Sequence, residues 1–131
     1  MLFTLLVIFL CTLPTQLFAA EKIWPLDLST RYLTSNFMEF REGRFHAGLD
    51  LKTDSQTGVP VIAVESGWIS RLKTTHNGYG KVLYLTTESG ETYVYAHLER
   101  IADRFQPAII SARSKANSYT VSLRFARDRF P

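Results

Sequence analysis

The stretch GWISRLKTTHNGYGKVLYLTTESGETYVYAHL, residues 67–98, decides the predicted fold. β-branched and aromatic residues, which favour strands, gather in three runs: Gly67–Thr74, Lys81–Thr87 and Glu91–Leu98. The segment His76–Gly80 between the first two runs contains Asn and Gly, which tolerate positive φ. Ser89 and Gly90 are typical of a tight hairpin between the last two. The stretch therefore predicts three consecutive antiparallel strands.

The neighbouring sequence extends this pattern in both directions. VPVIAVE, Val59–Glu65, predicts another strand upstream. After Leu98, the segment Phe105–Asn117 has Pro107 near its start and apolar residues at helical spacing, which predicts a short helix. Tyr119–Phe125 alternates again as a strand. We therefore expect an all-β fold, an antiparallel sandwich or open barrel, with one short inserted helix.

The first twenty residues have the composition of an export signal. Leu2–Leu13 is an apolar run of the length of a signal-peptide core, and Ala19 and Ala20 are small residues suited to cleavage. We expect residues 1–20 to be a signal peptide and the protein to reach the periplasm, the cell envelope or the exterior. Cys11, the single cysteine, lies in this run, so the mature chain has no thiolate chemistry.

Two further segments complete the expected organisation. Residues 21–43 are interpreted as an extended lead-in, whose aromatic side chains should cover the sheet: Trp24, Phe37 and Phe40. Residues 44–131 are expected to form a single domain that carries the helix and the following strand at about 105–125.

Charge is distributed unevenly along the chain. From Arg100 onward there are seven basic residues and two acidic ones, a net charge of +5, whereas the preceding part carries −2. This basic C-terminal part could approach an anionic wall or membrane surface, or it could be an ordinary solvated face. No nucleic-acid-binding motif accompanies the charges, so we expect no nucleic-acid partner.

The segment RFHAGLD contains a histidine and a carboxylate four residues apart, His46 and Asp50. Both residue types are suitable zinc ligands. In a regular strand their Cα atoms would be roughly 13 Å apart, which is too far to share one ion. Gly48 is the residue best able to bend the backbone between them, and its missing side chain leaves room for an ion.

The other two histidines differ in their expected surroundings. Strand alternation places His97 on one face with Tyr93 and Tyr95, away from the expected core side. His76 lies in a turn and should be solvated. From the residues alone, a structural role for His97 and a chance His46–Asp50 spacing both remain open, because the pattern is short and permissive.

Four sequence blocks favour a functional role for these residues over a chance spacing: FHAGLDLKT, GVPVIAVESGWIS, NGYGKVLYL and TYVYAHLER. In this order and spacing they resemble the lysostaphin-type family of zinc metallopeptidases, and the similarity runs from about Leu33 to Asp103. Members of that family cut peptide cross-links in bacterial peptidoglycan. The resemblance therefore implies a Zn²⁺ cofactor and a peptidoglycan peptide as substrate.

The resemblance also implies a role for each candidate residue. His46 and Asp50 correspond to two zinc ligands. His97 corresponds to a catalytic histidine that assists the reaction without binding the metal. Tyr93 and Tyr95 correspond to a wall of the substrate groove.

One family feature has no counterpart here. The family's third ligand comes from a late His-x-His block, whereas this sequence has no histidine after His97 and stops at Pro131. We expect a family member that lacks its C-terminal strands, binds zinc poorly and has little hydrolytic activity. Alternatives are a non-catalytic peptidoglycan-binding or regulatory module, and a carrier domain of the lipoyl or sugar-phosphotransfer type. The carrier-domain hypothesis has less support, because no lysine that could carry the group stands at a suitable hairpin tip.

Overall fold

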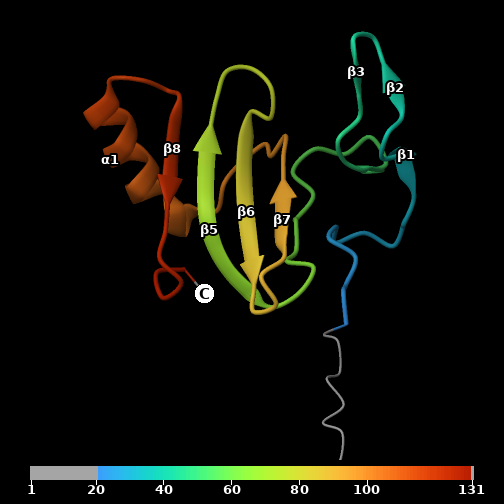
Figure 1. Cartoon of the computed structure of the whole chain (residues 1–131), viewed down its shortest axis with the longest axis horizontal. Coiled ribbons are helices and arrows are strands. Elements are labelled where there is room, and N and C mark those ends of the chain that lie inside the picture. The colour runs from blue at the N-terminus through green and yellow to red at the C-terminus, as the bar shows by residue number, and fades with distance from the viewer. Residues whose placement is uncertain (1–20, 131) are drawn as a thin grey trace, which may run out of the picture.

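The computed structural model describes residues 21–130 (Figure 1). A four-stranded antiparallel sheet has the order β7-β6-β5-β8: β5 (Gly67–Thr74), β6 (Lys81–Thr87), β7 (Thr92–Tyr95) and β8 (Val121–Arg124). Two smaller antiparallel sheets pair β1 with β4 and β2 with β3: β1 (Leu33–Ser35), β2 (Phe40–Arg41), β3 (Arg44–Phe45) and β4 (Asp50–Leu51). Of the predicted all-β sandwich or open barrel, the antiparallel sheets and the one inserted helix are confirmed, in a fold that is mostly β. The sheets do not close into a barrel within residues 21–130.

The hairpin β5–β6 forms the centre of the main sheet. Both strands have the predicted bounds, because β-branched residues alternate between turn signals on either side. Gly67 lies so close to the facing strand that an added Cβ would meet the Thr86 carbonyl oxygen at 2.3 Å. One face of the sheet buries the core together with the chain that follows β7: Ile69, Leu72, Leu85, Ile101, Phe105 and Ile109.

The helix α1 (Gln106–Ala116) follows a 3₁₀ turn, η1 (Asp103–Phe105), close to the predicted position. Pro107 lies in its first turn, where no intrahelical donor is needed. Asn117 ends it in the left-handed conformation, with φ 44°. Its buried residue Ile109 joins the core, and the helix packs beside β8 at one edge of the sheet (Figure 1).

The predicted strand Val59–Glu65 is wrong. The segment forms one isolated antiparallel bridge to the lead-in, between Val61 and Leu26, and two hydrogen bonds make this bridge. Ile62 N–H donates to the Pro25 carbonyl at 2.9 Å, and the Pro60 carbonyl accepts from Asp27 N–H at 3.1 Å. A proline on each side removes a ladder donor, so no regular strand propagates.

The lead-in also differs from the expected extended cover. It contains β1 and β2, and its side chains Phe37 and Phe40 are 61% and 72% exposed, so the prediction that they cover the sheet is wrong. Phe40 packs instead edge-to-face against Phe45 across the β2–β3 hairpin, with ring centroids 5.8 Å apart. Trp24 is half-buried.

Two expectations concern the start of the chain and the membrane. The predicted signal peptide, residues 1–20, lies outside the described residues. Within residues 21–130, no helix is long and apolar enough to cross a membrane.

Candidate metal centre

The short strands β1 to β4 bring His46 and Asp50 together. The β2–β3 hairpin turns at Glu42 and Gly43 and continues past its ladder, because His46 N–H donates to the Glu39 carbonyl at 2.8 Å. The chain then bends at Gly48, as predicted, before β4 pairs with β1. The histidine and the aspartate therefore face each other although a straight strand would separate them.

The two side chains approach through the atoms that would bind a metal. His46 Nε2 lies 3.2 Å from Asp50 Oδ1. Two ligands bound tetrahedrally to one zinc ion at its usual bond lengths are about 3.3 Å apart, so this spacing fits a shared ion. A Cβ at Gly48 would lie 3.7 Å from Nε2, in ordinary van der Waals contact, so the glycine leaves that volume beside the nitrogen unfilled. The imidazole is 12% exposed and the carboxylate 41% exposed, which leaves the carboxylate side open to solvent.

The other ring nitrogen of His46, Nδ1, forms a hydrogen bond with a backbone carbonyl. Nδ1 lies 2.9 Å from the Asn36 carbonyl oxygen. Since a carbonyl oxygen only accepts hydrogen bonds, we assign the ring proton to Nδ1 and the lone pair to Nε2. This arrangement is common for metal-binding histidines, whose second nitrogen donates to a carbonyl or carboxylate. A lone pair facing a carboxylate at 3.2 Å is favourable when a cation lies between them.

Arg41 and Ser35 contact the pair and Glu39 lies nearby, and the sequence analysis did not single out these three polar residues. Arg41 forms an ion pair with Asp50 Oδ2 and donates to Ser35 Oγ. Ser35 Oγ also contacts His46 Nδ1. Hydrogen bonds from the Ser35 hydroxyl and from the Asn36 N–H lower the pKa of Glu39 below its ordinary value, and the charge of Arg41 adds to this effect. These contacts span turns rather than a regular repeat, so no periodicity in the sequence indicates them.

His97 lies just past the end of β7. The strand ends at Tyr95, before the predicted Leu98, because His97 adopts a left-handed backbone with φ 57°. Its N–H donates to the Tyr79 carbonyl at 3.0 Å, and its exposed ring lies edge-on to the Tyr79 ring. Within the described residues, no hydrogen bond or ion pair joins this ring to His46 or Asp50. The strand it follows is the sheet edge nearest to β1–β3 (Figure 1).

Tyr93 and Tyr95 are half-buried and pack against the core, whereas Val94 between them is 47% exposed. The prediction that the tyrosines lie away from the core side is therefore wrong. Tyr95 Oη accepts a hydrogen bond from the Val64 N–H at 3.0 Å, and burial raises the pKa of its phenol. Tyr93 Oη donates to Glu91 at 3.1 Å. Their assignment to a substrate groove remains a prediction.

A comparison with protein families decides the identity of the chain. Residues 44–110, just over half of the sequence, match Peptidase family M23. The chain belongs to this family. The lysostaphin-type resemblance is thereby confirmed. No curated protein and no solved structure matches the chain.

M23 peptidases are zinc metallopeptidases that act on peptidoglycan peptides, generally in the cell wall outside the cytoplasm. The matched region contains His46, Asp50 and His97. Among residues 21–130, no group of three or more His, Cys, Asp or Glu side chains is arranged to hold a metal ion. The described part of this M23 chain therefore offers two suitable ligands, with imidazole and carboxylate donors that fit zinc.

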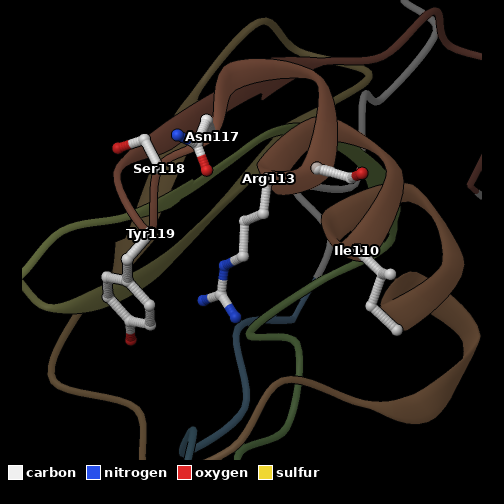
Figure 2. A pocket seen from close by; sticks show the side chains of 6 residues that line it. Ile110, Arg113, Asn117, Ser118 and Tyr119 are labelled. Carbon is white, nitrogen blue, oxygen red and sulfur yellow. The ribbon is translucent and has the colours of Figure 1, made fainter.

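His76 and the basic C-terminal part lie elsewhere. The His76 ring packs against Tyr119, with centroids 4.4 Å apart, and the Arg113 guanidinium lies 4.0 Å from the same aromatic centroid. Figure 2 shows the Arg113 side chain extending from α1 between Tyr119 and Ile110, in an open hollow of about 530 Å³. Helix α1 and β8 stand at the sheet edge opposite β7, so this hollow is separate from the His46–Asp50 pair (Figure 1).

Proposed function

We propose that this M23 chain is an exported module for peptidoglycan peptides in which His46 Nε2 and Asp50 Oδ1 bind Zn²⁺. The observation that carries the proposal is their 3.2 Å separation, combined with the carbonyl acceptor on His46 Nδ1. A bound zinc ion supplies Lewis acidity and lowers the pKa of water toward neutrality. The activity supported best is hydrolysis of a peptide amide in the cross-links of the cell wall.

The other candidate residues have separate roles in this proposal. His97 exchanges a proton with the attacking water or the leaving amine and does not bind the metal. Tyr93 and Tyr95 line one wall of the groove that receives the peptide. Removal of His97 should therefore reduce hydrolysis and leave zinc affinity unchanged.

A titration of the full chain with Zn²⁺ tests the metal site. We expect saturable but weak binding, because a third protein ligand is absent from the described residues. His46→Ala and Asp50→Asn should each abolish it, whereas His76→Ala should not change it, because that ring packs against Tyr119. Absence of saturable binding, or its persistence in His46→Ala, would overturn the proposed site. Stoichiometric binding tighter than micromolar would show that a third ligand is present after all.

A second function, a non-catalytic peptidoglycan-binding or regulatory module, is favoured by the same two-ligand observation. Cosedimentation with purified cross-linked peptidoglycan, together with an assay for released peptides, separates the two. Binding that persists in His46→Ala and with a chelator, without product release, supports the module. Product release that requires His46 supports the enzyme.

The basic C-terminal part is a proposed contact for an anionic wall or membrane surface. Several of its charges already have partners: Arg127 pairs with Glu88, and Arg100 lies 3.9 Å from Asp103. Arg113 makes no ion pair within the described residues and lines the hollow of Figure 2. Salt-sensitive binding to anionic vesicles, weakened by Arg113→Gln, would support this contact.

A further inference from the structure

Arg41 contacts the outer atoms of both proposed ligands, directly or through one hydroxyl. Its Nη2 nitrogen forms the ion pair with Asp50 Oδ2 and donates to Ser35 Oγ at 2.9 Å. The same Ser35 oxygen lies 3.1 Å from His46 Nδ1. A single guanidinium nitrogen thus connects the carboxylate and the imidazole on the sides away from Oδ1 and Nε2.

Ser35 stands between Arg41 and His46. Its oxygen accepts the Arg41 N–H and lies beside His46 Nδ1. The Asn36 carbonyl, 2.9 Å from the same ring nitrogen, can only accept a hydrogen bond, so it requires the His46 proton on Nδ1, which leaves a lone pair on Nε2.

Arg41 acts on the aspartate in a parallel way. It binds Oδ2 and leaves Oδ1 directed at His46 Nε2. Asp50 is 41% exposed, so without this partner its carboxylate could rotate freely into solvent. Outer partners of this kind orient metal ligands, and removing them typically lowers metal affinity about 10- to 100-fold.

We infer that Arg41, acting with Ser35, is a positioning residue that orients His46 and Asp50 for a divalent cation. The inference rests on the proposed metal site. The Arg41 guanidinium also carries a positive charge. If charge repulsion were its main effect, Arg41 would compete with the metal cation for the Asp50 carboxylate. Its contact with the outer oxygen Oδ2 favours positioning, because the oxygen that faces Nε2 stays available.

The test compares Arg41→Ala, Arg41→Lys and Arg44→Ala in the full chain. Arg44 is the control because it is the cross-strand neighbour of Arg41, is exposed, and makes no side-chain hydrogen bond or ion pair within the described residues. Zn²⁺ affinity is measured by calorimetry, the ligand arrangement by the visible spectrum of bound Co²⁺, and folding by thermal unfolding of the metal-free proteins.

We expect Arg41→Ala to weaken Zn²⁺ binding about 10- to 100-fold and to alter the Co²⁺ spectrum. Arg41→Lys should retain more affinity than Arg41→Ala, since one ammonium can donate to both acceptors. Arg44→Ala should match the wild type. Unchanged or tighter binding in Arg41→Ala, with the wild type binding normally, overturns the positioning role alone. Absence of binding by the folded wild type overturns the metal site and this inference together.

Discussion

The phenol oxygen of Tyr95 accepts a hydrogen bond from the backbone N–H of Val64, and this contact fixes the segment before β5 against β7. Tyr95→Phe should lower the free energy of unfolding by about 1–3 kcal/mol, because it leaves that N–H without its partner. Tyr84→Phe is the matched control, since its hydroxyl has no hydrogen bond within the described residues. Urea unfolding of both variants checks the difference, and equal effects would contradict it.

The same tyrosine should give a measurable dependence on alkaline pH. Burial raises its pKa above the ordinary value of 10.0, so the folded chain holds the phenol proton more tightly than the unfolded chain. Its contribution to stability is therefore complete below pH 10.0 and is lost as the pH rises through the raised pKa. The stability difference between wild type and Tyr95→Phe should shrink over that range. A difference that stays constant above pH 10.0 would argue against the raised pKa.

Lys22 and Glu91 join the start of the described chain to β7 by an ion pair of 2.8 Å. The Lys22 ammonium lowers the pKa of Glu91 below 4.5, and the Glu91 carboxylate raises the pKa of Lys22. The carboxylate therefore contributes stability above pH 4.5 and loses it as the pH falls through the lowered value. Glu91→Gln should lower the melting temperature slightly at neutral pH and not at strongly acid pH, and high salt should reduce the difference. Glu42→Gln, an exposed carboxylate change, should show no such pattern.

Gly67 faces the Thr86 carbonyl across the β5–β6 ladder at a distance that excludes a Cβ. Gly67→Ala should cost about 1–3 kcal/mol of unfolding free energy, because the strands must separate locally. The neighbouring exposed change Ser66→Ala should stay within about 0.5 kcal/mol of the wild type. Chemical denaturation measures both, and a neutral Gly67→Ala would mean that the two strands adjust without strain.

Gly48 offers a test of the space beside the proposed ligands. A methyl group at Gly48 would lie in ordinary contact with His46 Nε2, so Gly48→Ala should fold normally. Gly48→Leu should fill the space that faces the two ligand atoms and abolish Zn²⁺ binding. Ala47→Leu, at an exposed neighbouring position, is the control for added bulk. Zinc binding by Gly48→Leu equal to that of Ala47→Leu would place the ion elsewhere.

The sequence predicted the central sheet well and its surroundings less well. Strands β5 and β6 and the helix α1 matched because alternating or helical apolar spacing stands between Gly, Asn or Pro signals. The segment Val59–Glu65 looked like a strand from its β-branched residues, but Pro60 and Pro25 interrupt its pairing with the lead-in.

The sequence indicated the two proposed ligands, but not the residues that contact them. His46, Gly48 and Asp50 were recognisable because imidazole, carboxylate and a flexible residue occur together. The contact of Arg41 with Asp50 depends on two turns between them, and local spacing does not encode such a contact. Tyr93 and Tyr95 point toward the core because the helix covers their face of the sheet. Strand alternation shows that the two side chains share a face, but not which face the helix covers.

The left-handed backbone of His97 makes its side-chain direction depend on a distant loop. The His97 N–H is bound to the Tyr79 carbonyl, and the following Leu98 N–H to the Lys81 carbonyl. Tyr79 belongs to the connection between β5 and β6, and Lys81 is the first residue of β6. The same connection is closed by the Thr75 N–H, which donates to the Gly80 carbonyl. Lengthening or shortening that connection by a single residue should therefore change the direction of the His97 imidazole, although its own neighbours in sequence stay the same.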